Sequence, residues 1–177
     1  MAEQQNILVI LGHPTAESLC AGMARAYAEG ARRAGAQVRF LDVGQLTFNP
    51  LFQGYGAAQP LEPDLLAAQA DITWAHHLVW VYPIWWGAMP ALLKGFIDRV
   101  LLPGYAFKYR KGSSLWDKLL AGRSAELLVT MDSPPWYFRW VTRMPGHHQM
   151  KKAILEFCGI RPVRVHSFGP VRSASTE

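Results

Sequence analysis

A short apolar run near the start of the chain restricts its fold more than any other feature. The residues from Asn6 to Leu11 are apolar after the first position, and Gly12, His13 and Pro14 follow directly. Such a run predicts a strand buried on both faces, which is typical of parallel sheets covered by helices on both sides. The glycine and proline predict a turn at the carboxyl end of this strand.

Helical and strand patterns alternate along the rest of the chain. Small and apolar residues recur from Ser18 to Ala34 and predict a helix that ends at Gly35, and Gln37 to Leu41 alternates as a second strand. We expect further strands over residues 77–81, 126–131 and 162–167, helices over 63–70, 90–101 and 146–157, and irregular segments over 45–63 and 102–114.

This alternation predicts an α/β fold, a flavodoxin-like three-layer sandwich whose five-stranded parallel sheet has the order 2-1-3-4-5. The 177 residues suffice for one such domain, which we expect to extend over residues 1–177. Ligands of these sheets bind beyond the carboxyl ends of the strands, between the first and third strands. We therefore expect a site lined by residues 13–20, by residues 82–89 and by the chain from Met131 onward.

Composition excludes several classes of protein. Half of the residues are hydrophobic and 18% are charged, which excludes a largely disordered chain, and two cysteines are too few for a disulfide scaffold. Neither a secretory signal peptide nor a membrane-spanning helix is predicted, because the longest apolar stretch, Leu78 to Leu93, is short and contains two prolines. We expect a cytoplasmic protein without membrane insertion. The net charge of +5 favours anionic ligands without choosing among them.

The first loop, GHPTAESLC, lies between a predicted buried strand and the start of a helix. Unpaired backbone N–H groups and the helix dipole favour an anion there, and Ser18 and His13 offer further donors. One interpretation is therefore a phosphate or pyrophosphate cradle. The other is an ordinary helix cap by Ser18 with an exposed His13, which the negative charge of Glu17 favours.

The loop after the third strand, YPIWWGAMP, places two tryptophans where solvent is expected. Trp85 and Trp86 offer flat apolar surface on which an aromatic cofactor could stack, and Gly87 would let backbone approach it closely. Alternatively, both rings pack into the core or into a subunit interface. The residues leave these interpretations open.

Other kinds of site find little support. The sequence contains neither a GxxxxGK[ST] phosphate loop nor a GxSxG nucleophile elbow. The adjacent histidine pairs 76–77 and 147–148 and the two separated cysteines do not have metal-ligand spacing, so no metal site is expected. Interleaved aromatic and basic residues in the last third of the chain suit single-stranded nucleic acid, but no nucleic-acid-binding module accompanies them, and a cover for a ligand or a partner subunit is the commoner role.

Four stretches, in order, resemble the flavodoxin-like NAD(P)H:quinone oxidoreductase family, which includes DT-diaphorase, the modulator-of-drug-activity-B proteins and the potassium-efflux ancillary proteins. They are GHPTAESLC, FNPLF at Phe48, YPIWWGAMPALLKGFIDRVLLPGYAFKY at Tyr82, and FCGIRPV at Phe157. The resemblance extends over nearly the whole chain, and the third stretch carries most of its weight.

The resemblance implies a flavin site. In this resemblance the phosphate region is held by His13, Ser18, Leu19 and Cys20. The isoalloxazine ring is supported by Pro83, Ile84, Trp85 and Trp86. A further flavin loop is formed by Thr130, Met131 and Asp132. Phe107, Tyr109 and Trp136 border the substrate pocket, and Tyr109, His147 and His148 are the catalytic candidates, with one of the histidines supplying a proton. A departure from the family follows Asp132, where larger members carry a glycine pair, so backbone approach to the flavin is expected to differ.

The resemblance also implies an activity. NAD(P)H would pass hydride to flavin N5 and leave, and a quinone or a similar acceptor would enter the same place to receive two electrons. FAD is expected from the length of the first loop, with FMN as the alternative, and a homodimer is expected because family members build each pocket from both subunits. A flavin-binding ancillary subunit docked on a membrane transporter remains the alternative function. A flavodoxin-type electron carrier is disfavoured by the basic pI of 9.4.

Overall fold

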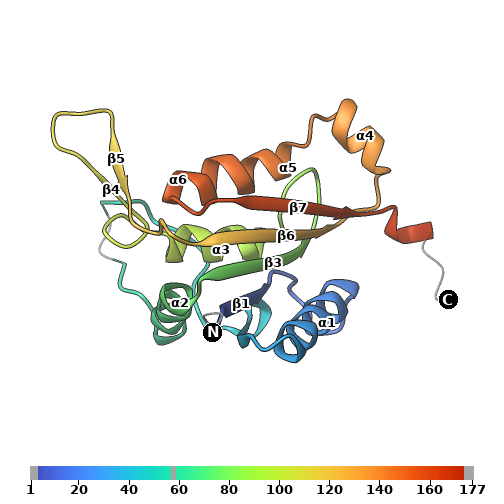
Figure 1. The fold of residues 1–177 in the computed structure, drawn as a ribbon. Helices are drawn as coiled ribbons and strands as arrows, with labels where there is room; N and C mark the ends of the chain where they lie inside the picture. The colour runs from blue at the N-terminus through green and yellow to red at the C-terminus, as the bar shows by residue number, and fades with distance from the viewer. Residues whose placement is uncertain (1–3, 57–58, 174–177) are drawn as a thin grey trace.

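The computed structural model describes residues 4–56 and 59–173 of the chain. Its main sheet is parallel and has the order β2-β1-β3-β6-β7, with β1 at Asn6–Leu11, β2 at Gln37–Asp42, β3 at His77–Pro83, β6 at Ser124–Thr130 and β7 at Val163–Phe168. Figure 1 shows β6 and β7 pointing to the same end of the molecule. The predicted order 2-1-3-4-5 is confirmed, with β6 and β7 as the fourth and fifth strands.

The register explains why the first apolar run is so continuous. β1 lies between β2 and β3, and Ile10 has Leu41 on one side and Trp80 on the other. The β1 side chains from Leu8 to Leu11 are fully buried. A central strand covered on both faces has no solvent side, so neither face tolerates polar residues.

Helices cover the two faces of the sheet unequally. α1, Leu19–Arg33, packs on one face against a cluster that includes Val9, Val79 and Leu128. The larger cluster, on the other face, receives side chains from α2 at Pro63–Trp74 and α3 at Ala91–Val100. It also receives side chains from a continuous helical stretch that consists of α5 at Pro145–His148, the π-helical η2 at Gln149–Leu155 and α6 at Glu156–Cys158. Gly35, with φ of +90°, terminates α1 as predicted.

Two elements depart from the sequence expectations. The segment expected to be irregular contains β4, Phe107–Tyr109, which pairs antiparallel with β5, Trp116–Lys118. Stacking of Trp116 on Phe157, with ring centroids 4.5 Å apart, holds this hairpin against the end of α6. α4, Pro135–Trp140, forms where only an aromatic run was noted. Both elements are short and depend on contacts with distant parts of the chain.

The long excursion between β2 and α2 begins with the short helix η1, Val43–Gln45, and its described residues 46–56 and 59–62 form no regular structure. Arg99 from α3 anchors it. This side chain is 1% exposed, pairs with Glu62 at 2.7 Å and donates to the carbonyls of Asn49 and Pro60. One buried guanidinium thus ties together two parts of the loop that also packs Phe48 against Phe96, with ring centroids 6.1 Å apart.

Candidate functional site

A cavity of about 230 Å³ lies at the carboxyl ends of β1, β3 and β6. Its lining consists of His13, Ser18, Leu19, Cys20, Pro83, Ile84, Trp85, Thr130, Met131, Asp132 and Val171. The loops after these three strands therefore converge as expected of a parallel sheet. Of the residues predicted to bind a cofactor, all but Trp86 line this cavity.

The start of α1 offers hydrogen-bond donors to the cavity. Ser18 caps the helix, since its Oγ accepts from the N–H of Ala21 at 3.1 Å. Within the part of the chain that the structure describes, the N–H groups of Leu19 and Cys20 have no partner. The first turn of α1 contains no acidic residue. The two interpretations of Ser18 are therefore compatible: its oxygen caps the helix while neighbouring amides remain free for an anion.

His13 is oriented by the loop that carries it. Its Nδ1 lies 3.1 Å from the backbone nitrogen, 3.0 Å from the hydroxyl and 3.2 Å from the carbonyl oxygen of Thr15, so Thr15 engages this nitrogen in either tautomer of the ring. The ring meets Trp85 edge-on, with centroids 5.5 Å apart and planes at 74°. Nε2 has no partner among the described residues, so it is available to a ligand.

A tight turn after β3 presents the two tryptophans. Trp85 and Ala88 exchange backbone hydrogen bonds of 2.9 and 3.0 Å, and the central residues Trp86 and Gly87 have φ of 51° and 78°, the signs of a type I′ turn. A tryptophan in left-handed backbone is uncommon and marks a strained position. Trp85 is 46% exposed and Trp86 is fully exposed, so neither ring belongs to the core of this chain.

The beginning of α5 supports that turn. A Cβ on Gly146 would lie 2.7 Å from the carbonyl oxygen of Gly87 and 2.9 Å from Cδ1 of Ile84, so only glycine fits here. Pro145 also lies beside Gly87. Sequence reasoning missed this pair and Val171, although the Pro-Gly dipeptide was a signal of close backbone approach.

The end of β6 closes the cavity. Thr130 Oγ1 lies 3.3 Å from Cys20 Sγ, and burial raises the pKa of this thiol, which is therefore neutral at pH 7. Asp132 stands at the rim, where its carboxylate accepts from the backbone N–H of Arg172 at 3.2 Å. The cavity therefore combines amide donors on one side with a single carboxylate on the other.

The two candidate histidines differ sharply. His147 is buried, hydrogen-bonded through Nε2 to Ser167 Oγ at 2.8 Å and packed edge-on against Phe138. Burial, and secondarily the neighbouring His148, lower the pKa of His147 to about 4. His148 is exposed. Neither residue lines the cavity, and His147 is neutral at physiological pH.

The residues predicted to border the substrate pocket lie elsewhere in the single chain. Phe107 and Tyr109 line a second cavity of about 340 Å³ beside Phe157 and Cys158. Figure 1 places their strand, β4, at the opposite end of the molecule from the carboxyl ends of β6 and β7. Trp136 is exposed on α4 and lines neither cavity. The chain alone therefore does not assemble the predicted pocket.

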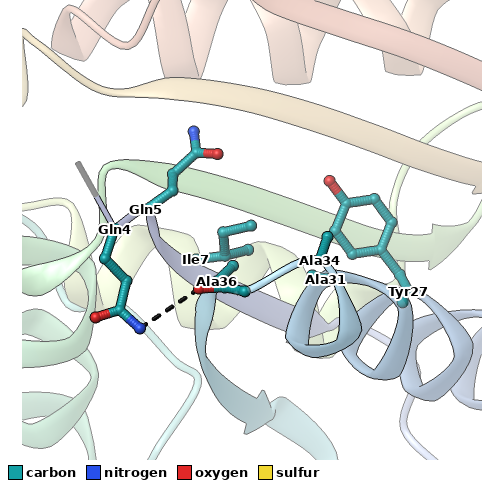
Figure 2. Close-up of a pocket in the computed structure, with 9 residues that line it drawn as sticks. Gln4, Gln5, Ile7, Tyr27, Ala31, Ala34 and Ala36 are labelled. Carbon is teal, nitrogen blue, oxygen red and sulfur yellow. Dashed lines mark hydrogen bonds between the residues drawn. The ribbon is translucent and has the colours of Figure 1, made fainter. Parts of the chain in front are cut away.

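A larger cavity, about 760 Å³, lies where β1 begins and α1 ends. Figure 2 shows that alanines, glutamines and Tyr27 line it, and its hydrogen bond, from Gln4 Nε2 to the carbonyl of Gly35 at 3.4 Å, is long. The smaller cavity is the better candidate because free amides, a histidine and aromatic rings converge on it.

The described residues contain neither a metal-binding cluster nor a membrane-spanning helix. Residues 4–56 and 59–173 hold no group of three or more histidine, cysteine or acidic side chains arranged to bind a metal ion. No helix within those same ranges is long and apolar enough to cross a membrane.

Comparisons with known proteins agree with this geometry. A family model described as flavodoxin-like fold matches residues 5–177. An uncharacterized NAD(P)H oxidoreductase of Haemophilus influenzae is 29% identical over 172 residues, which cover 94% of this chain and 84% of the relative. Rat NAD(P)H dehydrogenase [quinone] 1 is 26% identical over 92% of this chain and 69% of its own. The crystal structure of Smu.1420 from Streptococcus mutans superposes with a TM-score of 0.81 at 29% identity, covering 97% of this chain and 90% of that one.

Proposed function

The chain belongs to the flavodoxin-like-fold family whose model matches it from residue 5 to residue 177, and on that premise we propose that it is a flavin-dependent NAD(P)H:quinone oxidoreductase. The observation that carries the proposal is the convergence of the loops after β1, β3 and β6 on one cavity with free amides at a helix start. Relatives named as NAD(P)H oxidoreductase and NAD(P)H dehydrogenase [quinone] support the reaction class.

The residues of the cavity suit the phosphate end of a flavin. The unpaired N–H groups of Leu19 and Cys20 and the positive end of the α1 dipole attract a phosphate, and the Ser18 hydroxyl can donate while its oxygen caps the helix. His13 Nε2 is a further donor in the tautomer that carries the proton there. The cavity of about 230 Å³ is below the ~300–1,000 Å³ of typical small-molecule sites, so a flavin would extend beyond it along the surface.

Exposed aromatic and backbone groups suit the ring end. Pro83 and Ile84 form the cavity wall at the end of β3, and Trp85 presents its half-exposed ring beside His13. A bound flavin would supply the two-electron chemistry, taking hydride from NAD(P)H and passing it to the acceptor in alternate half-reactions. The protein's part is to orient the rings, exclude water and place donors where negative charge develops.

FAD is the proposed flavin, on the resemblance of the first loop to FAD-binding members of the family, and FMN is the alternative. A solved structure named NADH:FMN oxidoreductase, EmoB, is 26% identical to this protein, covers 93% of this chain and superposes with a TM-score of 0.63. FMN is therefore retained as the alternative flavin. The free amides bind a phosphate of either flavin.

A homodimer would complete the substrate pocket. Phe107 and Tyr109 lie at the end of the molecule opposite the flavin cavity, so they can border a nicotinamide or quinone only if a second copy places them against the Trp85 turn. The exposed rings of Trp86 and Tyr109 are consistent with such a contact. Of the proton-donor candidates, we propose His148 or Tyr109, because burial keeps His147 neutral.

Absorbance spectra of the purified protein, before and after anaerobic addition of NADPH, test the proposal. We expect flavin bands in the visible region that bleach with NADPH. Trp85→Ala combined with Trp86→Ala should lose flavin while the circular dichroism spectrum stays unchanged, because both rings lie outside the core. Trp140→Ala, which removes an exposed tryptophan that does not line the cavity, is the control and should keep its flavin. A colourless protein that cannot be reconstituted with FAD or FMN would contradict the proposal.

A further inference from the structure

α4 exposes most of its side chains. Among residues 136–140 of this helix, Phe138 is the buried one, at 4% exposure, and its ring packs edge-on against His147 with centroids 5.0 Å apart. Trp136 and Trp140 are four residues apart, so they share the helix face opposite Phe138. They are 63% and 72% exposed. One buried phenylalanine therefore fixes a helix whose outer face consists of two indole rings.

The surroundings extend this apolar face. Tyr137 is 41% exposed and meets Trp136 edge-on at 5.9 Å, and Val141, at 56% exposure, follows the helix. Contiguous apolar surface of this kind is uncommon on soluble proteins and marks an interaction site. Tryptophan and tyrosine are also the residues that concentrate at the boundary between lipid and water, because their rings are apolar and their N–H or O–H groups remain hydrated.

Only positive charge accompanies these rings. Between Asp132 and Glu156 the sequence contains no acidic residue. Arg139 and Arg143 are exposed, and Arg139 Cζ lies 5.3 Å from the ring centroid of Trp140. Arginines beside interfacial aromatic rings attract anionic lipid headgroups.

The position of α4 suits contact with a broad surface. Figure 1 shows that α4 stands out from the body of the molecule, at the end where β6 and β7 finish. The chain then returns through Pro145 and Gly146, which support the turn that carries Trp85. A surface bound by α4 would therefore lie at the same end of the molecule as the cavity.

We propose that the α4 patch, formed by Trp136, Tyr137, Arg139, Trp140, Val141 and Arg143, docks peripherally on an anionic lipid bilayer. The aromatic rings would enter the headgroup region and the two arginines would pair with anionic headgroups. A bilayer fits better than a protein groove because the helix is short and protruding. It fits better than nucleic acid because an exposed valine and two exposed indole rings lie beside the arginines. This docking is independent of the proposed activity.

Flotation of the full chain with unilamellar vesicles tests the docking. We expect the protein to float with vesicles of phosphatidylcholine and phosphatidylglycerol and to bind pure phosphatidylcholine much more weakly. Arg139→Gln with Arg143→Gln should lower the partition coefficient on anionic vesicles by about 10- to 30-fold. Trp136→Ser with Trp140→Ser should lower it by about 10-fold or more on both kinds of vesicle.

Matched controls remove exposed apolar and basic residues from other faces. Leu51 and Leu66 are 72% and 53% exposed, on the loop before α2 and on α2 itself, and Leu51→Ser with Leu66→Ser should float like the wild type. Arg32→Gln, on α1, should do the same. Circular dichroism confirms that every variant is folded.

Four results would overturn the proposal. The first is equal flotation of the wild type and the Trp136→Ser, Trp140→Ser variant, and the second is equal loss in the Leu51→Ser, Leu66→Ser control. The third is failure to float together with a change of oligomeric state in the tryptophan variant, which would make the patch a contact between copies of the chain. Binding to single-stranded RNA but not to vesicles would assign the patch to nucleic acid instead.

Discussion

Replacing Ser18 by asparagine or by aspartate separates its two roles. Ser18 Oγ caps α1 through the Ala21 N–H, while the neighbouring amides of Leu19 and Cys20 are free to bind a phosphate. Serine, asparagine and aspartate are about equally good at the start of a helix, so both variants should keep the free energy of unfolding within about 0.5 kcal/mol of the wild type. The aspartate variant alone places a negative charge in the proposed phosphate site.

The size of the effect follows from the geometry. A phosphate bound by the first amides of α1 lies within the same turn as residue 18. Two unit charges about 6 Å apart, at an effective dielectric constant of about 20, repel by about 3 kcal/mol. That energy corresponds to a dissociation constant for flavin raised by about 100-fold. The asparagine variant should bind flavin almost as tightly as the wild type, because it is neutral.

Titration of each apoprotein with FAD, followed by quenching of flavin fluorescence, gives the dissociation constants, and urea unfolding of the same samples gives their stability. Equal flavin affinity of Ser18→Asn and Ser18→Asp would refute the reasoning, because it would place the phosphate away from the start of α1. A parallel loss of stability and affinity would show that the cap, and not the charge, controls binding.

Three further predictions concern residues outside the α1 cap. Arg99→Met should lower the free energy of unfolding by about 3 kcal/mol, because it leaves Glu62 and two loop carbonyls without their buried donor, and a loss below about 1 kcal/mol in urea unfolding would contradict this. The pKa of His147, about 4 in the folded chain against an ordinary value of 6.5, means that its contribution to stability is complete above pH 6.5 and is lost as the pH falls toward 4. Between pH 6.5 and pH 4 the wild type should lose about 3 kcal/mol of its free energy of unfolding through protonation of His147, and the His147→Gln variant should lack this loss. An equal dependence of stability on pH in the variant and the wild type would refute the lowered pKa of His147. Gly146→Ala should displace the turn at Gly87 and weaken flavin binding by about 10-fold, and a variant that binds like the wild type would show that the turn is not held by this contact.

Much of the fold was predictable because local sequence and burial point to the same answer. The continuous apolar run from Asn6 to Leu11 predicted a strand with both faces covered, and the structure places it so. The helices between the strands predicted a parallel sheet, and the number of strands suggested the order of flavodoxin-like sheets. The hairpin at Phe107 to Lys118 and the helix α4 were not predictable. Three-residue strands and six-residue helices carry too little local preference to form without the contacts that tertiary packing supplies.

The cavity lining was predictable for the same reason. Residues directly after parallel strands end at one edge of the sheet, so their meeting is a consequence of topology. Local sequence could not tell which of the two adjacent histidines is buried. His147 and His148 are chemically identical in sequence, and only the packing of Phe138 and Ser167 around one ring lowers its pKa.

By itself, then, the sequence indicated the strands, the helices and the loops that follow the strands, because each depends on the periodicity of hydrophobic side chains and on neighbours a few residues away. The strand order was predicted from the arrangement known for sheets of this kind, and the pairing of strands tens of residues apart belongs to the tertiary structure. Tertiary structure decided that Trp86 and the tryptophans of α4 point outward and that Arg99 anchors a long loop. It also decided that Tyr109 lies at the end of the molecule opposite the cavity. Those outcomes depend on which distant surfaces meet and exclude water, and no local pattern of residues specifies them.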